Sequence, residues 1–194
     1  MERSTVYYPE PQITKFLYAS KWMAPVYLII RVYVGWAWLT AGWGKVTNPA
    51  WVGSNAGAAV TGYLNGAVAR SQGEGASVTV WYAWMIENLF LPMAPLMSYL
   101  VAFGEVIIGV ALILGLLTGA AAFFGGLMNV AFLFAGTLST NPLLFVLATW
   151  LVLAWRVAGY YGLDRWVLPM IGAPRGEFDD DSKTAGQQRT TTVA

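Results

Sequence analysis

The stretch MSYLVAFGEVIIGVALILGLL, residues 97–117, decides the fold class of this chain. It carries a single charged residue, Glu105. A helix needs about 20 mostly apolar residues to cross the hydrocarbon core of a bilayer, so this stretch predicts a membrane-spanning helix. Three further stretches have a similar length and character: residues 24–43, which contain Arg31; residues 120–138, which contain Asn129; and residues 142–161, which contain Arg156.

The composition also indicates a membrane protein. Of the 194 residues, 57% are hydrophobic and 11% are charged, whereas soluble domains carry roughly 25% charged residues. The chain contains no Cys and no His, which are the usual ligands of haem, iron–sulfur, copper and zinc centres. We therefore expect no metal or haem to be bound by residues of this chain. The net charge of +1 gives no electrostatic reason to expect binding of nucleic acid.

The connections between the apolar stretches predict how they pack. Short turns join the last three stretches, so neighbouring helices must run antiparallel. The first connection, residues 45–96, is long and largely apolar. We expect it to contain interfacial or re-entrant helices packed on the bundle. Its segment 78–95 leaves an alternative open, a fifth membrane span.

Basic residues set the expected orientation. Both tails are rich in Lys and Arg, the two short turns carry no charge and the long connection has only two basic residues. Such an excess marks cytoplasmic segments. Both termini are therefore expected in the cytoplasm, which requires an even number of spans. The fold is predicted to be all-α, an integral four-helix bundle crossing the inner (plasma) membrane several times, with a long extracytoplasmic first loop.

The pattern of apolar and charged residues also divides the chain into three parts. Residues 1–23 are expected to form a cytoplasmic N-terminal tail, and residues 24–165 the membrane domain. Residues 166–194 are polar over most of their length. Segments of low hydrophobicity cannot bury enough apolar surface to fold, so we expect a cytoplasmic and largely disordered C-terminal tail.

Charged groups within the spans point to a role, because each costs roughly 2.5–3.5 kcal/mol on insertion scales. Depth estimated from the helical rise places Glu105 and Asn129 near the midplane. It places Arg31 and Arg156 in the inner half, within reach of Glu105 for a long side chain. Two interpretations remain open: a buried salt bridge that fixes helix register, or a site for an anion, a proton or a quinone headgroup.

A second group of residues lies at the outer end of the first span, where residues 42–45 read GWGK. Lys45 places a cation at the membrane surface, where the loop that contains Glu87 can fold over it. These residues are either plain interfacial anchors or a binding site for an anionic or carbonyl-bearing group between Lys45, Trp43 and Arg31.

The same residues carry a resemblance to a known family. Arg31 followed by GWGK at residues 42–45, and GE at residues 104–105 followed by Gly109, resemble the DoxX/DoxD family of membrane proteins. The resemblance covers residues 24–165 and implies a four-helix membrane fold. The family includes the membrane subunit of a thiosulfate:quinone oxidoreductase. The resemblance therefore implies a quinone as cofactor and other membrane redox subunits as partners, and it is compatible with a homo-oligomer.

Three functions remain open at this point. The first is a non-catalytic subunit that anchors or assembles a quinone-linked respiratory or photosynthetic complex. The second is a catalytic subunit of the thiosulfate:quinone type, and the third is a small transporter of an anion or an organic solute. If the subunit is catalytic, the residues expected to carry out the chemistry are Glu105, Arg31 and Lys45. Those expected to hold the cofactor are Trp43, Lys45, Asn129 and Arg156.

Overall fold

The computed structural model describes residues 10–173, and within this range it contains helices and turns but no strands. The all-α prediction is therefore confirmed. The helices, in chain order, are α1 (Gln12–Ala19), η1 (Lys21–Met23), α2 (Ala24–Val46), α3 (Ala58–Ala69), α4 (Val80–Met85), the π-helix η2 (Ile86–Phe90), α5 (Ala94–Leu114), α6 (Thr118–Phe134), α7 (Asn141–Leu153), α8 (Trp155–Ala158) and α9 (Asp164–Met170).

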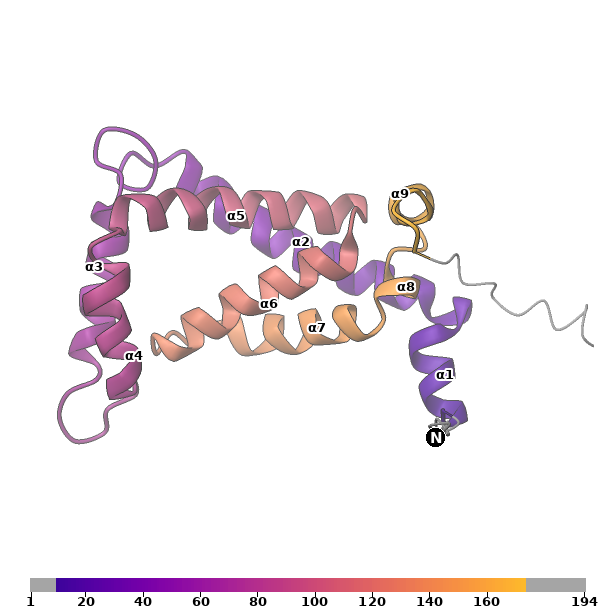
Figure 1. The fold of residues 1–194 in the computed structure, drawn as a ribbon, viewed down its shortest axis with the longest axis horizontal. Coiled ribbons are helices and arrows are strands. Elements are labelled where there is room, and N and C mark those ends of the chain that lie inside the picture. The colour runs from indigo at the N-terminus through magenta and orange to yellow at the C-terminus, as the bar shows by residue number, and fades with distance from the viewer. Residues whose placement is uncertain (1–9, 174–194) are drawn as a thin grey trace, which may run out of the picture.

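Four long helices run along the length of the molecule (Figure 1). Helix α2 packs most extensively on α5, and α6 packs most extensively on α7. Each of the four overlaps one of the predicted spans, although α7 ends at Leu153, well before the predicted end at residue 161. By length and composition, α2 (with η1) and α5 are able to cross a membrane, whereas α6 and α7 are shorter apolar helices.

Proline and glycine account for where these helices begin and end. Helices α2, α5 and α7 each have Pro in their first two positions, where the missing N–H costs no hydrogen bond. Helix α5 ends at Gly115, which has a φ of 65°. This left-handed conformation is the common helix terminator, and glycine adopts it without strain.

The remaining helices lie across the two ends of the bundle (Figure 1). Helices α3 and α4 cover one end, whereas α1, α8 and α9 lie at the other. The described chain therefore starts and finishes at the same end. The alternative of a fifth span is wrong, because the segment 78–95 forms only the short helices α4 and η2 before α5 begins.

The interface between α2 and α5 depends on glycine. A Cβ atom on Gly42 would lie 2.6 Å from the backbone nitrogen of Val106, and one on Gly109 would lie 2.5 Å from that of Leu39. Neither distance leaves room for a side chain. The two backbones therefore approach as closely as small residues allow in membrane helix pairs.

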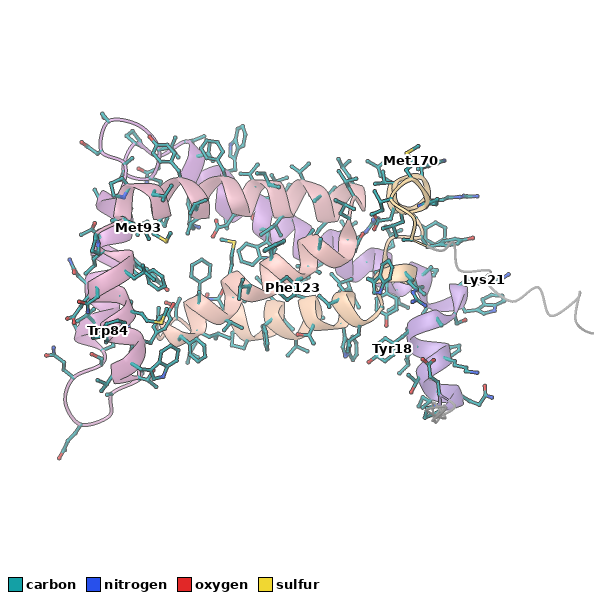
Figure 2. The ribbon with its side chains drawn as sticks, in the orientation of Figure 1. Tyr18, Lys21, Trp84, Met93, Phe123 and Met170 are labelled. Carbon is teal, nitrogen blue, oxygen red and sulfur yellow. The ribbon has the colours of Figure 1, made fainter. Side chains whose placement is uncertain are left out.

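Large apolar side chains cover the outward faces of the four long helices, and Figure 2 shows them projecting along the outer edges of α5 and α7. Examples, one from each helix, are Trp36, Ile107, Phe124 and Trp150, which are all exposed. Soluble monomers rarely expose apolar patches beyond a few hundred Å². This surface is suited to contact with lipid.

Two of the predicted boundaries between parts of the chain can be compared with the described helices. Helix α1 lies within the expected tail 1–23, and α9 crosses the expected domain boundary at residue 165. The expected disorder of the C-terminal tail concerns chiefly residues 174–194, which lie outside the described residues.

Candidate functional site

An ion pair joins α2 to α5 inside the bundle. The ammonium nitrogen Nζ of Lys45 lies 2.6 Å from Oε2 of Glu105 and donates a hydrogen bond to it. The side chain of Glu105 is 1% exposed, whereas that of Lys45 is 20% exposed. The lysine is therefore the only one of the two groups that the surroundings can reach directly.

Neighbouring groups hold this ion pair in place. Gly42 brings α2 against α5 so closely that a Cβ on it would lie 2.9 Å from Cβ of Glu105. The ring of Trp51 lies 5.2 Å from Nζ of Lys45, within the range of a cation–π interaction. The hydroxyl of Ser98 on α5 donates a 2.6 Å hydrogen bond to the carbonyl oxygen of Trp51. The pair is thus a positioned cross-link between two helices, covered by an aromatic ring.

Arg31 does not take part in this ion pair, so the prediction that it reaches Glu105 is wrong. It is 1% exposed, and its Nη2 donates a 3.1 Å hydrogen bond to the carbonyl oxygen of Tyr161. The packing of α2 on α5 places its guanidinium beside Gly115. Ten residues of helix, about 15 Å at about 1.5 Å each, separate Gly115 from Glu105. The sequence estimate failed because it placed the outer ends of the two spans at the same level. The contacts of Gly42 with Val106 and of Gly109 with Leu39 set a different offset between α2 and α5.

Asp164, which the sequence analysis missed, organises the end of the bundle where Arg31 lies. It is 3% exposed and interacts electrostatically with Arg31. Its carboxylate accepts hydrogen bonds from the backbone N–H groups of Leu117 and Thr118. Those donors are at the start of α6, where a carboxylate is favourable. The sequence feature that could have indicated Asp164 is its position as an acidic residue shortly after the last apolar stretch.

Asn129 lies in the core of the bundle as predicted, and it is fully buried. Neither atom of its amide has a hydrogen-bond partner among the described residues, and the same holds for Nε1 of Trp38. Trp38 lies against the same face of α6, since a Cβ on Gly125 would be 3.1 Å from its Nε1 and its ring centroid is 6.4 Å from that of Phe132. Buried polar atoms normally have partners, so this pair of side chains is unusual.

The chemistry of Asn129 and Trp38 fits a carbonyl group. The amide offers N–H donors as well as an acceptor, and the indole offers one N–H donor. A quinone carbonyl oxygen accepts such hydrogen bonds. Trp38 was not found from sequence, because it belongs to a span with several tryptophans and nothing local distinguishes it from those that face outward.

Two predicted cofactor-binding residues lie elsewhere. Trp43 is 63% exposed on the outer surface of α2. Arg156 is exposed and lies over the ring of Trp155 at 5.3 Å. The expectation that Arg156 joins a central polar core is therefore wrong, because α7 ends at Leu153 and α8 directs this side chain outward. The loop residue Glu87 is also exposed, and Trp51 covers Lys45 instead.

Comparison with known proteins gives one match. The family model described as DoxX matches residues 26–137, which is more than half of the chain. The matched region runs from the start of α2 to the turn after α6, and it contains Lys45, Glu105, Trp38 and Asn129. The search of curated proteins and the search of solved structures each found no significant match.

Proposed function

The chain belongs to the DoxX family of membrane proteins, and from this premise we propose that it is the membrane subunit of a quinone-linked redox complex, which it anchors or helps to assemble. The observation that carries this proposal is how the buried charges are used. Lys45 and Glu105 neutralise one another across α2 and α5, and Arg31 binds a backbone carbonyl. An ion pair that is buried in this way fixes the register of the two helices that it joins.

We further propose that α6 and α7 cross the inner membrane together with α2 and α5. Helix α7 is followed by α8 after a single residue, and residues 141–158 would extend about 27 Å at about 1.5 Å per residue. This approaches the hydrocarbon thickness of about 30 Å. Exposed aromatic residues on α6 and α7, such as Phe124 and Trp150, are suited to lipid contact.

A catalytic role in quinone reduction is the second candidate, and the unpartnered Asn129 and Trp38 favour it. When bound, a quinone supplies the chemistry of accepting two electrons and two protons. The side chains of Asn129 and Trp38 would hold its carbonyl oxygen and orient the ring, and the apolar core around them would exclude water. Glu105 is a less suitable proton donor in this scheme, because its carboxylate is buried and already paired with Lys45.

Purification in a mild detergent from cells that naturally express the chain tests both proposals. The wild type, Glu105→Gln, Asn129→Leu and the exposed control Arg165→Gln would be compared for co-purifying proteins, extractable quinone and thiosulfate-dependent quinone reduction. The anchoring role predicts stoichiometric redox subunits with the wild type and with all variants that fold. Absence of any redox subunit from the wild type would refute it.

The catalytic role makes a different prediction in the same experiment. Asn129→Leu would retain the partner subunits but lose bound quinone and most of the activity. Unchanged quinone content and activity in Asn129→Leu would refute this second candidate and leave the anchoring role intact.

A further inference from the structure

A cleft of about 450 Å³ lies between α3 and the turn that joins α6 to α7. Its polar lining consists of Tyr63, Arg70 and Thr137, and glycines and Leu138 supply most of the remainder. None of these residues belongs to the ion pair of Lys45 or to the buried pair of Asn129 and Trp38. The cleft is therefore a separate feature of the molecule.

Arg70 brings a positive charge to this cleft that no described carboxylate balances. Between residues 10 and 173, the only ion pair is that of Lys45 with Glu105. The guanidinium of Arg70 has five N–H donors, and Nη2 donates one 2.8 Å hydrogen bond to the carbonyl oxygen of Ala135. That bond fixes the position of the guanidinium and leaves its other donors for a ligand.

Gly136 makes this arrangement possible. Its φ of 76° is in the left-handed region, and a Cβ there would lie 3.0 Å from Nε of Arg70. The turn after α6 therefore brings its backbone against the guanidinium, where a larger residue would push the side chain of Arg70 away.

Two hydroxyl groups complete the polar lining. The hydroxyl oxygens of Tyr63 and Thr137 lie 2.9 Å apart and share a hydrogen bond. That bond uses one hydroxyl hydrogen and leaves the other to donate to a ligand. Burial raises the pKa of Tyr63, against smaller opposing effects of Thr137 and Arg70, so the phenol keeps its proton at neutral pH.

The position of the cleft indicates the kind of ligand. It lies at the end of the bundle that α3 and α4 cover (Figure 1), next to Leu138, which is 69% exposed. If the long helices cross the membrane, this end is at the level of the lipid headgroups. Arginine binds phosphate oxygens through charge-assisted and often bidentate hydrogen bonds, and the hydroxyl groups are able to donate further hydrogen bonds.

We propose that this cleft binds a phosphate group, supplied by a membrane lipid or by free phosphate, through Arg70, Tyr63 and Thr137. The site goes beyond the proposed function, since neither anchoring nor quinone reduction requires it. Its failure would leave that function untouched.

The test uses the full chain purified in a neutral, phosphate-free detergent. Thermal unfolding would be followed as phosphatidylglycerol is added, with a diacylglycerol of the same acyl chains as its control. In a second series sodium phosphate would be added, with sodium chloride of equal ionic strength as its control. We expect phosphatidylglycerol to raise the unfolding midpoint and the diacylglycerol to leave it unchanged. A rise with phosphatidylglycerol alone identifies a lipid as the source, and a rise with inorganic phosphate as well identifies phosphate itself as sufficient.

Variants separate binding from a merely structural role of Arg70. Arg70→Gln should weaken the apparent affinity for the phosphate compound at least about tenfold, as expected for loss of a charge-assisted bond, and Arg70→Lys should retain part of it. Tyr63→Phe with Thr137→Val removes the hydroxyls and keeps the charge, and should weaken binding less. The basic control Arg165→Gln, on α9 at the opposite end, should bind as the wild type does.

Three results would overturn the proposal. The first is that neither phosphate compound raises the unfolding midpoint of the wild type. The second is an undiminished rise of the midpoint in Arg70→Gln, and the third is a loss of affinity in Arg165→Gln equal to that in Arg70→Gln. If Arg70→Gln does not fold, the double hydroxyl variant decides, because unchanged affinity there removes the site as described.

Discussion

The two members of the ion pair, Lys45 and Glu105, differ in exposure, so their single substitutions should differ in their effect on stability. Lys45→Met leaves a carboxylate that is 1% exposed without a partner, and we expect this to lower the free energy of unfolding by about 3 kcal/mol. Glu105→Gln leaves a lysine that is 20% exposed and able to reach headgroups or water. This variant should therefore lower the free energy of unfolding by clearly less. Chemical unfolding in one detergent measures both.

The double variant provides the control for this comparison. Lys45→Met together with Glu105→Gln removes both charges, so its cost should be smaller than the sum of the two single costs. Equal costs for the two single variants, or strict additivity in the double variant, would mean that the pair does not contribute as the geometry indicates.

Asn129 lends itself to the opposite prediction, a gain in stability. An unsatisfied buried polar group costs about 1–3 kcal/mol, so Asn129→Leu, of similar size, should raise the free energy of unfolding by about 1 kcal/mol in the absence of a ligand. Asn141→Leu is the control, because the side-chain amide of Asn141 donates a 3.0 Å hydrogen bond to the backbone carbonyl oxygen of Thr137, and its loss should lower the free energy of unfolding. A loss with Asn129→Leu in ligand-free protein would indicate that the amide has partners after all.

At the scale of the helices, the packing of α2 on α5 should be sensitive to single methyl groups. Gly109→Ala would place its Cβ 2.5 Å from the backbone nitrogen of Leu39, which forces the helices apart and should cost about 1–3 kcal/mol. Gly104→Ala on the same helix meets no atom closer than 3.7 Å and should be neutral or stabilising. Unfolding of both variants in detergent checks this, and equal tolerance would exclude the close contact.

The helices themselves could be predicted from sequence, but the pairing of their side chains could not. A run of about 20 apolar residues has one stable form in a bilayer, and Pro and Gly set its ends. The pairing of Lys45 with Glu105 joins residues 60 apart in the chain. It depends on the rotation and the axial offset of α2 against α5, which the close contacts of Gly42 with Val106 and of Gly109 with Leu39 set. Asn129 was predictable, because a polar side chain in the middle of an apolar span is expected to face the interior of the bundle and not the lipid.

For the whole molecule, the two ends differ in charge as well as in structure. The end formed by α1, α8 and α9 carries most of the described basic side chains outside the bundle core: Lys15, Lys21, Arg156 and Arg165. The opposite end has Lys45, which Glu105 neutralises, and Arg70. The excess of Lys and Arg marks the cytoplasmic side. We therefore expect α3 and α4 to cover the outer end and both termini to lie inside.

The absence of cysteine from the chain allows a direct test of this topology. Glu74→Cys in the α3–α4 connection should react with a membrane-impermeant maleimide in intact cells. Gln12→Cys on α1 and Met170→Cys on α9 are both at exposed positions and should react only after permeabilisation, because four crossings return the chain to the side where it started. Reaction of Gln12→Cys and Met170→Cys on opposite sides would require an odd number of crossings. It would mean that α7, the shortest of the four at 13 residues, does not cross the membrane.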